Sequence, residues 1–371
     1  MKILACSDFH ADWVTDGVER FEELERSANE VVDCAIGEKV ELFLFLGDLA
    51  NPGTSRAHRA VAMASHCARR LTHEGIPSLW ISGNHDVAED GHGTSTVGSL
   101  GDLTHARAVV EPRSYPYGSA WVVVLPFTPR SHQYDPAEYI RKVIVDLEQL
   151  KTTPERPIII ASHLNIEGIG PGSEADEFAR GRNVFFPSAT VGELMARYNV
   201  LALNGHYHGA QTFGEVVIPG AIGRLTHGEE KNVPGFIIAE TTKTRGKKKV
   251  GWSVERYDLD NAARLTTIVP SPEGLSEGDL RVAAGTYVRV LPPSGFAIQP
   301  SDCERQLLEG GALAAKVMPS AASKSVLATN KPKRERVGHR VVVEQMVAES
   351  HSKDKEALGE LCGSVMDQVG M

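Results

Sequence analysis

The sequence predicts an α/β domain built from layered, mixed β-sheets. Strand and helix patterns alternate from the first residue, which is typical of a sheet covered by helices. After Asn199 the pattern changes to strands in close succession, which indicates that part of the sheet is antiparallel. Hydrophobic residues make up 42% of the 371 residues, enough for a large buried core.

The apolar stretches predict the individual elements. Helices are expected over residues 17–37 and 55–73. In the first of these segments, apolar residues recur at three- and four-residue spacing and form one face. The strands are expected as short, nearly continuous apolar runs. They cover residues 3–6, 41–46, 78–81, 121–125, 157–161, 200–203, 215–218, 235–239 and 250–254.

Composition divides the chain into three parts. A stretch rich in proline and glycine, residues 270–278, reads as a linker between a large domain over 1–269 and a short α+β segment over 279–319. Small, polar and basic residues over 320–333 predict a second linker. The last part, 335–371, returns to helical periodicity and carries two apolar stripes.

The charge and the cysteine content indicate how the protein could bind a polyanion and in which compartment it is expected. The net charge of -9 disfavours a protein that holds a polyanion by its overall field, although two basic runs, 243–249 and 331–336, add local positive charge. Each run is more typical of a solvated loop. The five cysteines form no CxxC pair, which fits a reducing cytoplasm rather than a disulfide framework. We expect a cytoplasmic protein without membrane association, since neither a signal peptide nor a membrane-length apolar run is recognisable.

Polar residues of one chemical kind follow five of the predicted strands. They are Ser7-Asp8-Phe9-His10, Gly47-Asp48, Gly83-Asn84-His85-Asp86, Ser162-His163 and Gly205-His206-Tyr207-His208. Ligand sites of α/β proteins lie beyond the carboxyl ends of strands, so we expect these groups to meet in one crevice. Carboxylate, amide and imidazole donors without a thiolate suit manganese, iron or zinc.

The spacing of these groups suggests how they hold metals. Asp-x-His and His-x-His would place two ligands on the same side of an extended backbone. The glycines at 47, 83 and 205 would let the chain turn sharply beside the metals. A single histidine is more often structural, and His92, His105, His132 and His227 are expected to be loop or surface residues, with His227 the one most able to approach a substrate. Tyr207 should point away from the metals.

The five groups resemble the motifs of the calcineurin-like metallophosphoesterases, and most closely those of SbcD-type nuclease subunits of DNA double-strand-break repair. The resemblance spans residues 1 to about 240 and includes the segment 218–236 that follows the last histidines. It implies a four-layer αββα sandwich for residues 1–269, a small α+β capping domain at 279–319 and C-terminal helices at 335–371.

The resemblance also implies a site with two divalent metal ions, Mn²⁺ being expected. One ion would be held by Asp8, His10 and His208 and the other by Asn84, His163 and His206, with Asp48 bridging them. His85 would bind no metal and would contact the scissile phosphate as the catalytic residue. Asn51, Arg182 and Arg224 are candidates for substrate contact. Asn51 stands where these nucleases usually carry a second histidine, so it can bind a phosphate oxygen but cannot transfer a proton.

The implied function is a metal-dependent DNA exonuclease or endonuclease that hydrolyses phosphodiester bonds. The resemblance implies a homodimer that docks its C-terminal helices onto the coiled-coil base of an SbcC-type ABC ATPase in a DNA repair complex. The residues leave two alternatives open. A phosphodiesterase of cyclic nucleotides or other small molecules would use the same metals, and a non-catalytic scaffold would keep the fold alone. The Asp-Arg-Gly and Arg-Gly-Asn-His elements of protein serine/threonine phosphatases are missing from the sequence.

Overall fold

The fold is built on two six-stranded mixed sheets. A computed structural model describes residues 1–88, 94–101, 105–128, 132–149, 156–169, 184–243 and 250–319. The first sheet has the order β14-β13-β1-β4-β5-β6 and the second β11-β12-β10-β9-β8-β7. The first contains β1 (Lys2–Cys6), β4 (Leu42–Phe45), β5 (Ser78–Ile81), β6 (Ala106–Val109), β13 (Gly235–Lys243) and β14 (Val250–Asp258). The second contains β7 (Arg113–Tyr117), β8 (Ala120–Leu125), β9 (Ile158–Ser162), β10 (Val200–Asn204), β11 (Gln211–Phe213) and β12 (Val216–Ile218).

Alternate residues along β1 face different layers of the molecule. Ile3 and Ala5 belong to an apolar cluster between the sheets, which also contains Leu203 of β10. Leu4 and Cys6 point the other way, into a cluster shared with the helices on the outer face of the first sheet. The two sheets therefore pack face to face through one set of residues and bind their helices through the other.

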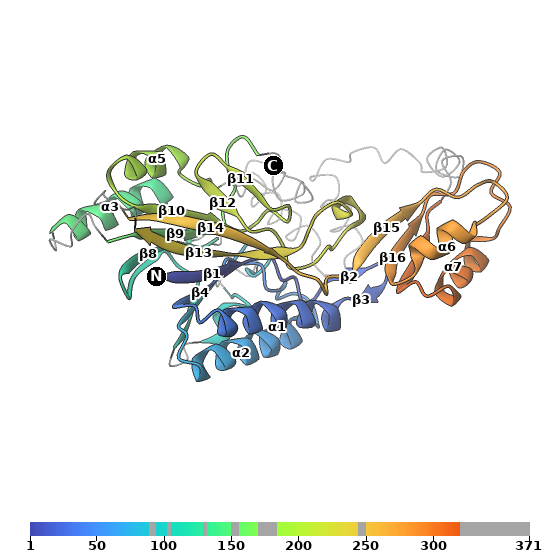
Figure 1. The fold of residues 1–371 in the computed structure, drawn as a ribbon, viewed down its shortest axis with the longest axis horizontal. Coiled ribbons are helices and arrows are strands. Elements are labelled where there is room, and N and C mark those ends of the chain that lie inside the picture. Colours follow the sequence, from blue (N-terminus) through green and yellow to red (C-terminus); the bar gives the residue numbers. More distant parts are fainter. Residues whose placement is uncertain are drawn as a thin grey trace, which may run out of the picture.

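The helices complete a four-layer αββα sandwich (Figure 1). α1 (Phe21–Gly37) and α2 (Ala57–His73) cover the first sheet, and α3 (Pro136–Gln149) and α5 (Ser188–Arg197) cover the second. The predicted fold class is confirmed. None of the helices in the described part of the chain combines the length and the apolar character that a membrane crossing needs.

The predicted elements are found, with differences at their ends. The strands predicted to end at residues 239 and 254 continue to Lys243 and Asp258, because β13 and β14 pair with each other along their whole length. The predicted start of the first helix, at residue 17, was wrong, since α1 begins at Phe21. A two-stranded hairpin of β2 (Val14–Thr15) and β3 (Val18–Glu19) precedes α1, and it turns at Asp16 and Gly17, which both have positive φ.

β6 and β7 were not predicted. β7 contains Pro116, which argues against a central strand, and the structure places β7 at the edge of its sheet, where a missing N–H is tolerated. β6 is likewise the last strand of its sheet. Edge strands bury less of their surface, so their apolar signal is weaker than that of β1 or β4.

A small α+β unit follows the sandwich. Three parallel strands, β15 (Arg264–Ile268), β16 (Thr286–Val290) and β17 (Ala314–Val317), pack against α6 (Glu277–Ala283) and α7 (Pro300–Glu309) around a core of their own. β15 pairs with β16 and with neither large sheet, although it lies before residue 269, where the predicted boundary falls. The capping role of this unit remains a prediction. Residues 335–371, predicted as partner-binding helices, lie outside the described residues.

Candidate metal centre

The polar motifs follow strands of both sheets at the same end of the sandwich. β1, β4 and β5 run parallel in the first sheet, and β9 and β10 run parallel in the second. Their carboxyl ends lead directly into the five sequence motifs. Folding therefore brings together side chains that are up to two hundred residues apart in the sequence, as expected for a site at strand ends.

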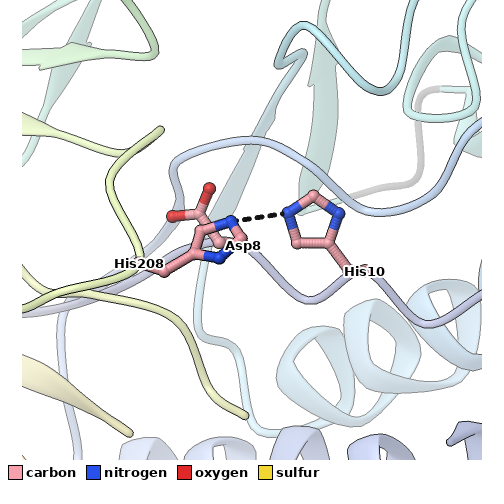
Figure 2. A group of neighbouring side chains, drawn as sticks. All are labelled: Asp8, His10 and His208. Atoms are coloured by element: carbon pink, nitrogen blue, oxygen red, sulfur yellow. Dashed lines mark hydrogen bonds between the residues drawn. The ribbon is translucent and has the colours of Figure 1, made fainter. Parts of the chain in front are cut away.

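The first group consists of Asp8, His10 and His208, all of them buried. Their ligand atoms lie within 4.8 Å of one another, and the Nε2 atoms of the two histidines are 3.1 Å apart. Figure 2 shows the carboxylate and the two rings turned toward one another, with His208 on a different segment from Asp8 and His10. This is the set that the resemblance implied for one metal.

The second group consists of Asp48, His163 and His206, also buried and within 4.8 Å of one another. Asn84 lies among them, because its Oδ1 is 2.9 Å from Nε2 of His163 and 3.0 Å from Nδ1 of His206. The implied ligands of the second metal are thus in contact. Together the two groups fit a dimetal site.

Asp48 lies between the groups. Its Oδ2 is 3.2 Å from Nε2 of His163 in the second group and 3.6 Å from Nε2 of His10 in the first. Burial by itself would raise the pKa of Asp48, but the imidazoles of His163 and His85 hold that pKa well below its usual range. An ionised carboxylate that reaches both groups fits the bridging role.

Neighbouring acceptors orient the histidine rings. His208 donates from Nδ1 to Oε1 of Glu229 (3.0 Å), and His163 donates from Nδ1 to the carbonyl oxygen of Leu46 (2.6 Å). With a metal bound, each ring would be neutral and would present the lone pair of Nε2 to its metal group. The sequence motifs did not identify Glu229 as a partner of a metal ligand.

His206 has two amide neighbours. Its Nε2 donates to Oδ1 of Asn165 at 2.9 Å, which leaves the lone pair of Nδ1 facing Oδ1 of Asn84. Two acceptor atoms, Nδ1 of His206 and Oδ1 of Asn84, therefore face each other beside Nε2 of His163, an arrangement that a cation between them would satisfy. Asn165 was also missed by the sequence motifs.

Asp8 supplies an independent test of whether a cation fits. Its side chain is fully buried, and neither carboxylate oxygen has a hydrogen-bond partner among the described residues. Burial raises the pKa of Asp8 to about 6, since an ionised carboxylate is poorly stabilised in the interior. A divalent ion between Asp8, His10 and His208 would satisfy these oxygens. The residues present therefore fit two metal ions, whose identity stays open.

The backbone at the ligands is not extended. Asp8, His10, Asp48 and His206 all have positive φ, between 42° and 77°, which L-residues rarely adopt. We expected Asp-x-His and His-x-His to place both ligands on one side because side chains alternate along an extended backbone. That reason was wrong, since the backbone here is not extended. Asp8 and His10 do meet, but His206 and His208 turn into different groups.

The motif glycines serve two different needs. Gly47 has φ +106°, the sharp turn that was predicted before Asp48. Gly83 and Gly205 adopt no such φ and instead allow close approach. A Cβ on Gly83 would lie 2.2 Å from Oδ1 of Asp48, and one on Gly205 would lie 2.2 Å from Oγ of Ser7.

His85 lies at the rim of the two groups. Its side chain is half-buried, whereas all seven implied metal ligands are buried. Its backbone N–H donates to Oδ1 of Asp48 at 2.9 Å, and its ring centroid is 4.9 Å from that of His10. The next residue, Asp86, accepts hydrogen bonds from the N–H groups of Asp48 and Gly83 and so ties the loops after β4 and β5 together.

The three predicted substrate contacts have different surroundings. Asn51 is exposed, and its Oδ1 accepts from the N–H of Gly53. Arg224 donates to the carbonyl oxygens of Asn232, Ala262 and Ala263, which joins it to the backbone beside the small unit. Arg182 lies outside the described residues. Substrate contact by any of them remains a prediction.

Two further expectations concern individual side chains. Tyr207 is buried and points into the core below the second sheet, as predicted, where its hydroxyl accepts from the N–H of Ile166. His227 is not a surface side chain. Only 6% of it is exposed, and its ring nitrogens contact Asp16 and Glu230 at 3.1 and 3.2 Å.

Replacing Glu229 with glutamine should weaken metal binding at the first group by roughly 10- to 100-fold, because the carboxylate that orients His208 is lost. Titration of the metal-free protein with Mn²⁺ by calorimetry measures this effect. Glu215→Gln, at an exposed position on the β11–β12 turn, is the matched control and should bind like the parent. Parent-like affinity in Glu229→Gln would contradict the assigned role.

Comparison with known proteins assigns the family. The model of the calcineurin-like phosphoesterase family matches residues 1–210, a span that contains every implied metal ligand and His85. Among solved structures, the chain is similar to a dimetal phosphatase from Danio rerio, with 13% identity over 64% of this chain and 92% of that one and a TM-score of 0.39. It is also similar to a protein from Thermus thermophilus, with 15% identity over 69% of this chain and 98% of that one and a TM-score of 0.37. A phosphopantetheinyl hydrolase from Mycobacterium tuberculosis is similar with 13% identity over 58% of this chain and 87% of that one and a TM-score of 0.32.

The family assignment rests on the sequence match and on the two buried groups of metal-ligating residues. The chain belongs to the calcineurin-like phosphoesterase family.

Proposed function

We propose that the protein is a two-metal phosphodiesterase that cleaves DNA, acting as the nuclease subunit of an SbcCD-type repair complex. The observation that carries the reaction class is the position of His85 beside two metal groups that share Asp48. DNA as the substrate is supported by the resemblance of the motifs, and of the segment 218–236, to SbcD-type nucleases.

The proposed reaction divides its tasks among the residues of the site. When bound, the two cations supply a nucleophile at neutral pH and neutralise charge on the phosphate. Asp48 and the other residues of the two groups would hold these cations at the strand ends, where a phosphate could reach them. His85, the half-buried ring at their rim, donates a hydrogen bond or a proton to the phosphate or to the leaving sugar oxygen.

The net charge of -9 has to be reconciled with a DNA substrate. An SbcC-type ATPase docked on residues 335–371 would supply much of the DNA-binding surface, and dimerisation would place two sites on one substrate. The apolar stripes of that segment, Val342–Val347 and Leu358–Val369, have the spacing of helices that lie in a groove of a partner.

One assay compares the candidate substrates directly. Purified full-length protein with Mn²⁺ is offered linear duplex DNA, single-stranded DNA, cyclic AMP and a chromogenic phosphodiester side by side. We expect DNA cleavage to exceed cyclic AMP hydrolysis, and DNA affinity to fall with salt as phosphate contacts are screened. His85→Ala controls for a contaminating nuclease. Rapid hydrolysis of cyclic AMP with no DNA cleavage under any divalent metal would instead favour a small-molecule phosphodiesterase.

Deleting residues 335–371 should separate catalysis from partner binding. We expect the truncated protein to stay folded, to bind both metals and to hydrolyse the chromogenic phosphodiester, but to lose co-purification with an SbcC-type ATPase. Circular dichroism, metal analysis and co-purification of the co-expressed proteins measure these properties. Unchanged binding of the ATPase, or unfolding of the truncated chain, would contradict the role proposed for this segment.

A further inference from the structure

Two adjacent acidic residues, Glu229 and Glu230, contact different parts of the molecule. Glu229 is the last residue of the short turn η4 (His227–Glu229), and Glu230 follows it. Glu229 accepts the Nδ1 hydrogen bond of His208, a member of the first metal group. Glu230 accepts a hydrogen bond from the hydroxyl of Thr267 on β15 of the small unit. Arg289 on β16 donates to the same hydroxyl at 3.0 Å. The turn therefore lies between the metal group and the small α+β unit.

The contacts through Glu230 and Thr267 form a first route between the first metal group and the small α+β unit. A second route, also a chain of contacts, joins the same two parts through a buried arginine. Arg20 is fully buried, and its guanidinium lies 3.9 Å above the ring of Tyr287 on β16. It forms a two-pronged ion pair with Glu23 at 2.6 and 2.9 Å, and Glu23 accepts from the N–H of Ala263 just before β15. The mechanism proposed above makes no use of this buried charge pair.

The route continues from Arg20 to the metal group without a gap. Arg20 donates to Oγ1 of Thr15 at 2.8 Å, and that hydroxyl donates to the carbonyl oxygen of Leu225 at 2.9 Å. The N–H of Leu225 donates to Oε2 of Glu229 at 2.8 Å. Each buried polar group thus has its partner, which makes the chain of contacts costly to rearrange piece by piece.

We propose that the small α+β unit positions His208, so that metal binding at the group of Asp8, His10 and His208 depends on contacts made by β15 and β16. Both routes end on the turn that carries Glu229. The second metal group has different supports, the carbonyl oxygen of Leu46 and the side chain of Asn165, which follow β4 and β9 of the large sheets. Loosening the small unit should therefore weaken one metal position and spare the other.

Thr267→Val tests the first route, since it removes the hydroxyl between Glu230 and Arg289 and keeps the size of the side chain. Calorimetric titration of the metal-free protein with Mn²⁺ should show one ion bound as in the parent and the other weakened by about tenfold. Thr267→Ser should restore binding. Thr266→Val is the matched control, because the neighbouring side chain points to the opposite face of β15. Parent-like binding of both ions in Thr267→Val would overturn the proposal.

Combining Thr267→Val with a substitution in one metal group, His208→Ala or His206→Ala, identifies which metal position is weakened. In His208→Ala the first position is already damaged, so adding Thr267→Val should change the remaining affinity little. In His206→Ala the remaining ion is the one supported by Glu229, and Thr267→Val should weaken it. Equal weakening in both backgrounds would indicate a general loss of stability and would overturn the proposal.

Thr15→Val tests the second route independently, with Thr15→Ser as its rescue. The hydroxyl that links Arg20 to Leu225 is lost, and the same single metal position should weaken. Paramagnetic resonance of the Mn²⁺-loaded protein provides a second measurement, because loss of one ion removes the coupling between the pair. Circular dichroism of the metal-free variants separates this effect from unfolding. A folded Thr15→Val protein that keeps a fully coupled pair would contradict the proposal.

Discussion

Replacing Asp48 with alanine is expected to remove at least one of the two metal ions and to abolish hydrolysis. Oδ2 of Asp48 reaches the histidines of both groups, and the side chain is fully buried. Without the shared anion, two cations would repel each other at short range in a site of low dielectric. The remaining ligands, mostly neutral imidazoles, do not offset that repulsion.

Elemental analysis of the dialysed Asp48→Ala protein measures the loss, and a Tm determined in a chelator tests whether the metal-free protein is still folded. Asp48→Asn separates charge from cavity, because it fills the same space without a negative charge and should lose metal as well. Asp260→Ala, at an exposed position, serves as the control. Two ions per chain in a folded Asp48→Ala protein would be incompatible with a bridging role.

Replacing His85 with alanine is expected to leave both metals bound and to lower kcat by about 10²–10⁴-fold, the range typical of a lost general acid. The contact between His85 and Asp48 is made by the backbone N–H, so it survives the change of side chain. The imidazole itself lies at the rim, 4.9 Å from the ring of His10 and outside both metal groups.

The leaving group distinguishes the two roles open to His85. If its ring protonates the leaving oxygen, hydrolysis of a chromogenic ester with an acidic phenol should fall much less than cleavage of DNA, because that phenolate leaves without a proton. If the ring stabilises the phosphate, both substrates should slow alike. Metal analysis accompanies the kinetics. Loss of a metal ion in His85→Ala would assign the residue to the ligand set instead.

The site could be predicted from the sequence because its ligands follow strands. Asp8, Asp48 and His163 follow buried apolar strands within three residues, and the carboxyl ends of parallel strands lie at one edge of a sheet. Their oxygen and nitrogen donor atoms predicted a metal site from the sequence alone. The supports of the ligands could not be found in this way. Glu229 and Asn165 acquire their roles only through contact with His208 and His206, and nothing in their local sequence marks it.

The first helix illustrates the same limit in the fold. Its apolar spacing correctly predicted the face that α1 packs on the first sheet, but it extended too early, through the hairpin of β2 and β3. Val18 matched the helical spacing and is nevertheless 37% exposed. Thr15 in the hairpin and Arg20 just after it contact Leu225 and Tyr287, residues from distant parts of the chain that local spacing cannot reveal.

By itself the sequence determined the layered α/β class, most strands of the two large sheets and the candidate metal ligands, since periodicity and strand-end motifs are local properties. The family resemblance added the expected division of these ligands into two groups with Asp48 between them. The tertiary structure alone decided which side chains support these ligands, Glu229 for His208 and Asn165 for His206, and how the small unit contacts the turn behind His208. The physical reason is that these pairings depend on left-handed backbone at the ligands and on hydrogen bonds between distant segments. Such strained conformations persist only where the surrounding structure holds them.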